Sequence, residues 1–386
     1  MSISFSNFKQ SLLRYAKAFV LPENALSSRQ KWILGLINLG FVVIFWVMSS
    51  FLVNDMVQDG SYRKPFFITY INTGLFSLYL IPYLNYENYT CKQFLQLIKQ
   101  EYDKTKVDLI KFDNETYGSH ADLEELRDIH EKVGIYETIK LSFQFLILWF
   151  SANLVTNASL SYTSVASQTI LSSTSSFFTL IIGYLYSIEK ININKIIGIL
   201  LSFSGVFIVT KIDSSSDDYS GFSKMVFVGN LLALLGALIY GIYTILLKFK
   251  ISIPNTTKER DLNTHLFFGF VGIFCLIGMW PFFFILNYLD YETFQLPPTK
   301  KILAILLTNG FITFISDFCW CKAVLLTSPL TVTVGLSMTI PLAMVGDWIL
   351  KSFIINWGYL FGAMIVTMGF LIINRDEEAD FVSDDF

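Results

Sequence analysis

The sequence predicts an all-α polytopic membrane protein, with ten transmembrane helices arranged as two inverted five-helix repeats. Three observations support this class. The chain of 386 residues is 53% hydrophobic and 15% charged, whereas a soluble domain carries about 25% charged residues. Its apolar residues gather into runs of about 20, the length that crosses a bilayer as a helix. The pattern of its first half also returns in its second half.

Ten apolar runs are separated by short polar breaks. They cover residues 32–53, 65–84, 137–157, 163–187, 193–211, 225–247, 264–286, 301–321, 328–350 and 354–374. A soluble helical protein has no core large enough to hide ten such runs, so we expect each to span the lipid bilayer. The net charge of −3 offers no basic surface, and we therefore expect no nucleic-acid partner.

The polar breaks divide the chain into four parts. Residues 1–30 form an N-terminal segment, 31–211 the first repeat with an insert at 84–136, 225–375 the second repeat, and 376–386 an acidic tail. With the N-terminus in the cytosol, 21 of the 28 Lys and Arg residues fall on the cytosolic side, as the positive-inside rule requires. We therefore expect both termini, the insert and the tail to be cytosolic.

The polar parts carry weaker signals. The mixed charge of the insert predicts a solvated, mobile segment in which a stretch such as Leu123–Leu126 is helical. The tail from Asp376 is acidic, and we expect it to be disordered. The segment 1–20 has Lys and Arg but no acid, which fits either a mitochondrial presequence or an amphipathic helix on the cytosolic leaflet. The second interpretation is favoured because no cleavage signal follows.

An internal repeat appears when 163–211 is placed on 327–375, since the two segments align without a gap. Matched pairs in this repeat alignment include Thr163 with Thr327, Thr169 with Thr333, Ser173 with Ser337, Asn192 with Asn356, Gly198 with Gly362, and Gly205 with Gly369. Each half holds five spans, an odd number, so the second half must enter the membrane upside down. This inverted arrangement is typical of secondary transporters, whose substrate site lies near the bilayer midplane between the halves.

The spans at 163–187 and 328–350 are rich in hydroxyl groups. Ser172–Ser176 is an unbroken run of five, and the second span carries Thr333 and Ser337 with Pro341, which should kink it. Hydroxyl groups in a span either bond the carbonyls of their own helix or line a wet cavity. A symmetry-related pair of such spans favours the cavity, and the level of Ser173 and Ser337 is where we first expect substrate.

Four glycines mark the spans at 193–211 and 354–374. They are Gly198, Gly205, Gly362 and Gly369. Small residues at this spacing let two helices approach closely. The stripe predicts either a homodimer seam or close packing inside one subunit, and the sequence does not decide between them.

Ionisable groups inside a membrane indicate function by default. Asp317 lies well within its span, five residues before Lys322, and its repeat partner is Asn153. It is either a structural partner of Lys322 or a carboxylate for a cation, a proton or the substrate. Lys248 ends its span as an interface anchor or a phosphate ligand. The candidate substrate-binding residues are Asn153, Ser172, Ser173, Thr333, Ser337, Asp317, Lys322 and Lys248.

Three segments of the sequence are similar to the corresponding segments of one known family. They are SYRKPFFITYINT at 61–73, ILWFSANLVTNASLSYTSVASQTILSSTSSFFTL at 147–180 and SDFCWCKAVLLTSPLTVTVGLSMTIPLAM at 316–344. The chain resembles the drug/metabolite transporter superfamily, with two EamA-type halves, in a fungal branch near solute carrier family 35, subfamily F. That branch includes a vacuolar membrane protein and a thiamine-repressible transport protein. The resemblance implies alternating access, a central cavity and dimers through the peripheral spans.

The expected function is secondary transport of a small polar metabolite across an internal membrane. The resemblance leaves nucleotide sugars, phosphorylated compounds and vitamin-like compounds open as substrates. A vacuolar location is favoured, with mitochondrial and Golgi membranes as alternatives. The rival function is a scaffold or receptor that acts through the 84–136 insert. Three scattered His and four Cys form no catalytic or metal-binding pattern, so we expect no enzyme, cofactor or metal.

Overall fold

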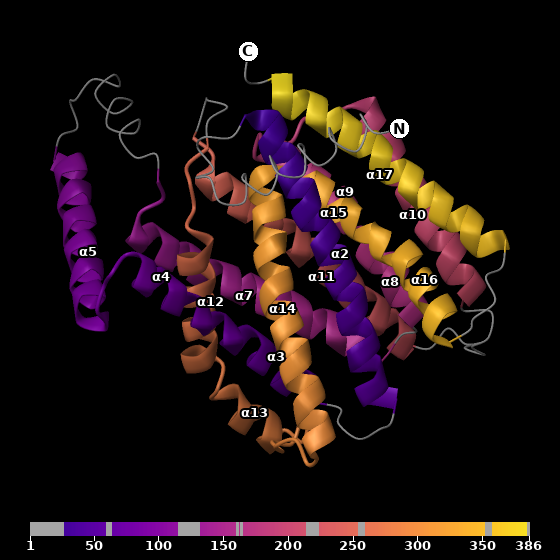
Figure 1. Cartoon of the computed structure of the whole chain (residues 1–386), viewed down its shortest axis with the longest axis horizontal. Coiled ribbons are helices and arrows are strands. Elements are labelled where there is room, and N and C mark those ends of the chain that lie inside the picture. The colour runs from indigo at the N-terminus through magenta and orange to yellow at the C-terminus, as the bar shows by residue number, and fades with distance from the viewer. Residues whose placement is uncertain are drawn as a thin grey trace, which may run out of the picture. The chain divides into compact units, whose positions relative to one another are not determined.

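The structure is a computed structural model that describes residues 27–58, 64–114, 132–159, 162, 165–213, 224–253, 259–351 and 357–383. The expected amphipathic helix over 1–20 and the helical turn at Leu123–Leu126 lie outside these ranges. The named elements of the described part are all helices (Figure 1). The all-α class predicted from the sequence is thus confirmed for this part of the chain.

The helices follow the predicted spans in order. The first half contains α2 (Ser28–Gln58), α3 (Pro65–Gly74), η2 (Leu75–Tyr79), α4 (Leu80–Tyr86), α5 (Cys91–Asn114), α7 (Ile135–Ser159), α8 (Val165–Ser173), α9 (Ser175–Leu185) and α10 (Ile193–Asp213). The second half contains α11 (Lys224–Ile251), α12 (Thr264–Gly278), α13 (Phe282–Tyr288), α14 (Lys300–Leu326), α15 (Pro329–Gly335), η4 (Leu336–Met338), α16 (Thr339–Lys351) and α17 (Trp357–Ser383).

Six stretches of the described chain are long and apolar enough to cross a membrane. They are Ser28–Leu52, Pro65–Tyr86, Ile135–Thr156, Val226–Ile251, Lys300–Leu326 and Pro329–Gly346. A seventh is obtained if α12 and α13, which meet at a bend of 45°, form one span. Helices α8 with α9, α10, and α17 lie at the three other expected positions but fall outside this count. Ten spans therefore stay a prediction.

The end of the chain differs from expectation. Helix α17 continues through Asp376 to Ser383, so the predicted disorder of the tail is wrong for these residues. The physical reason is a set of polar contacts with the start of α10. The Asp376 carboxylate accepts hydrogen bonds from Asn192 and Asn194, and Asp380 accepts one from Lys195 at 3.0 Å. Acidic residues that the sequence suggests are solvated are used to fix the last turns of the helix.

The insert is also more ordered than its charge suggests, because α5 occupies Cys91–Asn114. Its Phe94 is buried in a cluster with Leu80, Leu266 and Phe270. The Glu101 carboxylate accepts a hydrogen bond of 3.1 Å from the backbone N–H of Tyr136. The start of the insert is thus packed on neighbouring helices, and a description as merely solvated is wrong for it.

Two compact units make up the chain. The second unit spans residues 51–157 and 246–314, and its core is rich in phenylalanine. Phe66 and Phe67, at the start of α3, donate their backbone N–H groups to the carboxylate of Glu292 at 2.9 and 3.0 Å. The buried Glu292 thereby satisfies two backbone donors that a helix start always leaves open.

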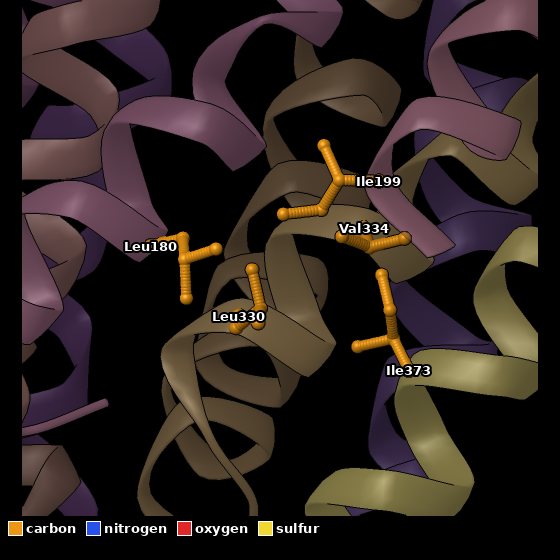
Figure 2. Close-up of a cluster of buried hydrophobic side chains, with 5 residues drawn as sticks. All are labelled: Leu180, Ile199, Leu330, Val334 and Ile373. Atoms are coloured by element: carbon orange, nitrogen blue, oxygen red, sulfur yellow. The ribbon is translucent and has the colours of Figure 1, made fainter. Parts of the chain in front are cut away.

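The first unit comprises residues 1–50, 158–245 and 315–386. Its centre is α15, whose seven residues are all buried. Leu330 and Val334 of α15 pack against Leu180 of α9, Ile199 of α10 and Ile373 of α17, as Figure 2 shows. Ser328 caps α15 by accepting a 3.1 Å hydrogen bond from the Thr331 N–H, and Pro329 fills the first position, where a missing N–H does no harm.

Helix α10 packs along α17 (Figure 1), and the predicted glycine stripe forms this contact. A Cβ atom on Gly205 would lie 2.7 Å from the carbonyl oxygen of Gly362, and one on Gly369 would lie 2.6 Å from that of Gly198. Both distances are below any real Cβ contact, so only glycine fits. The four glycines are therefore used within one subunit, which favours that interpretation over a homodimer seam.

Both hydroxyl-rich spans are broken in their middle. The first span divides at Thr174, between α8 and α9, and the second divides at η4, between α15 and α16. The repeat alignment carries Thr174 onto Met338, the last residue of η4. Pro341 follows η4 and lacks the N–H that would bond the carbonyl of Ser337, which accounts for the second break and fits the expected kink.

Candidate functional site

Two threonines connect the broken spans inside the first unit. The Oγ1 atoms of Thr179 on α9 and Thr333 on α15 lie 3.3 Å apart, and both side chains are buried. Thr333 Oγ1 donates to the carbonyl of Pro329 at 2.7 Å. Since a hydroxyl has one proton, Thr179 must be the donor in the pair. The two repeats thus contribute one hydroxyl each to a polar contact.

Three aromatic side chains extend this contact to α11 and α14. Trp320 Nε1 donates a 3.1 Å hydrogen bond to the hydroxyl of Tyr240, which also interacts with the Thr333 side chain. The ring of Tyr243 lies 5.0 Å from that of Tyr240 and 5.6 Å from that of Trp320. We call Thr179, Thr333, Tyr240, Tyr243, Trp320 and Asp317 the Asp317 cluster.

Asp317 lies on α14, three residues before Trp320, and is 6% exposed. Its Oδ2 atom has no hydrogen-bond partner among the described residues, and the carboxylate interacts electrostatically with Tyr240 and Tyr243. Burying a carboxylate without a partner is unfavourable, and such an atom in a native structure calls for an explanation. An ionised carboxylate only accepts hydrogen bonds, so a cation or a strong donor is the group that would satisfy it.

A glycine allows α11 to approach the cluster. A Cβ atom on Gly241, next to Tyr240, would lie 3.2 Å from the backbone nitrogen of Thr179 and 3.3 Å from its Oγ1. A side chain at this position would fit only if its neighbours on α9 moved by a few tenths of an ångström. The position of Tyr240 beside Thr333 therefore depends on the small residue that follows it.

The hydroxyl run at 172–176 makes mostly local bonds. Ser173 donates to the carbonyl of Ile170 at 2.7 Å, Ser176 donates to that of Ser173 at 3.0 Å, and Thr174 donates to that of Leu171. These carbonyls surround the break at Thr174. The side chain of Ser172 accepts a 2.9 Å hydrogen bond from Gln168. At least three of the five hydroxyl groups thus satisfy their own helix, the simpler of the two interpretations.

The remaining candidates are placed as follows. Ser337 lies in η4 and is half-buried, as is Lys322 on α14. Asp317 forms no ion pair among the described residues, so the structural pairing of Asp317 with Lys322 is not observed. Asn153 of α7 belongs to the second unit and donates to the carbonyl of Trp149 at 2.8 Å.

Lys248 also belongs to the second unit. Its Nζ atom lies 2.8 Å from Oε1 and 3.0 Å from Oε2 of Glu259, and its side chain is 7% exposed. The ion pair neutralises the charge that a phosphate ligand would need, which favours the anchor interpretation. The first unit therefore brings together Asp317 and Thr333, while Asn153 and Lys248 belong to another unit.

A second buried polar cluster, the Lys195 cluster, lies where α10 and α17 meet. Lys195 Nζ is 2.5 Å from Glu377 Oε1, 3.0 Å from Asp380 Oδ2 and 4.0 Å from Glu189 Oε2. Glu189 also accepts a 3.1 Å hydrogen bond from the Leu330 N–H at the start of α15. Burial and the neighbouring Glu377 raise the pKa of Glu189 well above its usual value, although Lys195 and Leu330 oppose the shift. One ammonium thus faces three carboxyl groups, and its charge can balance only one of them.

The aromatic members of the Asp317 cluster were not predicted from the sequence. Tyr240, Tyr243 and Trp320 stand in a chain with 19 Tyr, 7 Trp and 37 Phe, so composition did not distinguish them. One signal was present, since Trp320 follows Asp317 by three residues and thus shares its helix face. The Lys195 cluster was missed because Lys195 stands at the start of a predicted span, while Glu189, Glu377 and Asp380 lie in segments expected to be solvated.

Comparison with known proteins indicates the class of protein to which this chain belongs. A family model described as the EamA-like transporter family matches residues 129–211. An uncharacterized vacuolar membrane protein of Saccharomyces cerevisiae is 46% identical over 379 residues, which cover 94% of this chain and 95% of that protein. The thiamine-repressible mitochondrial transport protein THI74 of the same yeast is 38% identical over 351 residues, covering 90% and 92%. Together these matches define a membrane transporter.

The chain belongs to the EamA-like transporter family. Among its relatives, solute carrier family 35 member F5 of Pongo abelii is 28% identical over 422 residues, covering 91% of this chain and 78% of that protein. A chain of known crystal structure aligns with 90% of this chain and 98% of its own length, with a TM-score of 0.59 and 10% identity. At that identity the likeness concerns the fold alone.

Proposed function

We propose that this protein is a secondary transporter that moves a small polar metabolite across an internal membrane by alternating access. We propose its substrate site between the two repeats near the bilayer midplane, at the Asp317 cluster. The observation that carries the proposal is the buried Asp317 Oδ2 atom, which has no hydrogen-bond partner among the described residues. It lies in a cluster with aromatic groups of the second repeat and hydroxyl groups from both repeats. Intramembrane carboxylates mark substrate or ion pathways.

Two features support the inverted repeat. The breaks in the hydroxyl-rich spans fall at positions related by the repeat alignment, and interrupted spans in matching positions mark the binding region of many transporters. The glycine contacts are also reciprocal. The alignment turns the contact between Gly198 and Gly369 into one between Gly362 and Gly205, as a two-fold axis between α10 and α17 requires.

Alternating access is supported by a difference between equivalent helix pairs. Helix α9 packs against α15, through Thr179 with Thr333 and Leu180 with Leu330. The repeat alignment makes α8 and α16 the equivalent pair, and these two have no comparable packing in the described part of the chain. A bundle in which one of two symmetry-related helix pairs is packed and the other is not corresponds to one of the two states that a transporter exchanges.

The proposed site has Asp317 and Thr333 at its centre, and we add Thr179, Tyr240, Tyr243 and Trp320. The predicted residues Ser172, Ser173, Ser337 and Lys322 belong to the same unit and stay candidates for the path that leads to the site. Asn153 is retained as a proposal from its repeat relation to Asp317. Lys248 is assigned to the ion pair with Glu259.

We also propose a vacuolar membrane location, with both termini in the cytosol. The support is the 46% identical yeast relative that is named as a vacuolar membrane protein, while THI74, named as mitochondrial, keeps that membrane as an alternative. Nucleotide sugars, phosphorylated compounds and vitamin-like compounds belong in the first substrate panel. An N-linked glycan on Asn88, in the Asn-Tyr-Thr sequence after α4, would contradict the cytosolic placement of the insert.

Uptake by the purified protein in liposomes tests the function. We expect flux of at least one solute from a broad metabolite panel, measured with and without a pH gradient, and loss of that flux in Asp317→Ala. Glu87→Gln, which removes an exposed carboxylate of the second unit, is the matched control. The absence of flux across the whole panel would favour the scaffold or receptor function. Unchanged flux in both Asp317→Ala and Lys322→Ala would exclude the proposed site.

A further inference from the structure

We propose that the Asp317 cluster binds an organic cation, that is, a protonated amine or a quaternary nitrogen compound. The inference rests on the proposed function and names its substrate class. It combines two features that a cation needs in a site of low polarity. One is a negative charge without a partner, and the other is a group of aromatic rings.

The charge is the first feature. Asp317 is 6% exposed and forms no ion pair among the described residues, whereas Lys195 is bound to Glu377 and Lys248 to Glu259. Lys322 lies five residues along α14, about 140° around the helix from Asp317 at about 100° per residue. The structure thus holds a buried carboxylate that a positively charged ligand would complete.

The rings are the second feature. Tyr240, Tyr243 and Trp320 lie in mutual contact, and Asp317 is close enough to both tyrosines for electrostatic interaction. The indole N–H of Trp320 donates to the Tyr240 hydroxyl, which joins two of the rings through their polar atoms. Aromatic faces attract cations, and Trp and Tyr do so best. Tyr240 is only half-buried, so the cluster is not sealed.

Anionic substrates fit this cluster poorly. A sugar phosphate beside Asp317 would bring two like charges together in a medium of low dielectric constant, where repulsion is strong. A neutral sugar would receive no hydrogen bond from the Thr179 or Thr333 hydroxyl, because their protons are already donated to Thr333 and to the Pro329 carbonyl. Its own hydroxyl groups could donate to Asp317 but would leave the charge of the buried carboxylate unbalanced. A cation avoids both problems, because it meets an opposite charge and needs no hydrogen-bond donor from the protein.

Binding to the purified full-length protein tests the inference. The probes are tetramethylammonium, N-methylpyridinium and choline, with 3,3-dimethylbutan-1-ol as the uncharged isostere of choline and uridine monophosphate as an anion. We expect choline to bind at least tenfold more tightly than its isostere, and Asp317→Asn to weaken choline binding at least tenfold. Tyr243→Leu should weaken it about two- to thirtyfold, the range of a cation–π contact. Glu87→Gln should bind as the wild type does.

Several results would overturn the inference. They are binding of none of the cations, equal binding of choline and its isostere, or cation binding that Asp317→Asn leaves unchanged. Flux in liposomes separates this failure from failure of the proposed function. In one outcome, the protein takes up only neutral or anionic solutes and needs Asp317 only to respond to the pH gradient. That result would support the transporter function and contradict the organic-cation substrate. Cation binding without any flux would support the proposed binding site and contradict the proposed transport.

Discussion

Two clusters of buried acidic residues in the first unit differ in whether a cation lies beside the carboxylates. Glu189 and Glu377 share the ammonium of Lys195, and Asp380 completes the set. Asp317 is buried to a similar degree but has an oxygen without any hydrogen-bond partner among the described residues. Both clusters belong to the same unit, so the contrast comes from the partners that each carboxylate meets.

The difference separates architecture from function. A buried carboxylate that is paired with a cation and hydrogen-bond donors holds helices together. Removal of one partner leaves the other with an uncompensated buried charge. A buried carboxylate without a partner contributes nothing to stability, so its presence is better explained by a ligand. The Lys195 cluster accordingly holds α17 on α10, and we propose that the Asp317 cluster is available for substrate.

The largest expected effect is the loss of Lys195. Lys195→Met leaves Glu377 and Asp380 without their cation, and we expect it to destabilise the protein by about 3–5 kcal/mol. The measurement is thermal unfolding of the purified protein in detergent. Lys190→Met removes the same charge from an exposed neighbour and should stay near the wild-type melting temperature. Equal melting temperatures for the two variants would show that the cluster is not structural.

A next smaller effect concerns the seam that holds the Lys195 cluster together. In Gly205→Ala the new Cβ would lie 2.7 Å from the Gly362 carbonyl oxygen, so α10 and α17 must move apart, at about 1–3 kcal/mol. Gly40→Ala on α2 is the matched control, because nothing lies within 4 Å of its Cβ position. There the better helix propensity of alanine should stabilise the protein by about 0.5–1 kcal/mol. A stable Gly205→Ala protein with an altered oligomeric state would instead support a dimer seam.

The pH dependence of stability sharpens the comparison further. Folding raises the pKa of Glu189 above its value of 4.5, so the folded protein holds a proton that the unfolded chain has released. Stability should therefore fall as the pH rises above about 4.5, by at most about 1.4 kcal/mol per pH unit for one proton. Lys195, Glu377 and Asp380 face the same group. Glu189→Gln should flatten this slope, as thermal unfolding between pH 5 and 8 would reveal, and an unchanged slope would exclude Glu189 as its source.

The smallest effect is expected at single hydroxyl groups. Thr333→Val removes the contact with Thr179 and should destabilise the protein by about 1 kcal/mol, with reduced uptake. Ser173→Ala removes only a local bond to Ile170 and should leave uptake within about twofold of the wild type. Both variants are compared by melting temperature and flux in the same liposome preparation. A greater loss of uptake in Ser173→Ala would return the substrate to the level of Ser173 and Ser337.

The helices and the family resemblance could be predicted well from the sequence, because apolar runs, glycine spacing and short sequence motifs are local signals. The glycine stripe of Gly198 and Gly205 was found, but its partner helix was not, since a small residue shows only that something comes close. The hydroxyl run was found as well. Its hydrogen bonds to carbonyls such as that of Ile170 could not be predicted, because they depend on the geometry of the helix break.

The two acidic clusters show what the sequence could not provide. Asp317 was found because a charge in an apolar run is conspicuous, while Tyr240 and Tyr243 lie on a separate helix, α11, in a chain full of aromatics. Asp376 and Glu377 looked like a solvated tail, because nothing in their own segment reveals Lys195, which belongs to the first half of the chain. Contacts between distant segments decide the function of a charge, and one sequence does not contain them.

We propose that Asp317 serves the ligand and not the fold. The most direct measurement compares Asp317→Asn with the wild type by melting temperature and by uptake in liposomes of a solute that the wild type transports. We expect an unchanged or higher melting temperature, because a neutral amide is easier to bury than a carboxylate, together with at least a tenfold loss of uptake. Wild-type uptake combined with a loss of stability like that of Lys195→Met would contradict the claim.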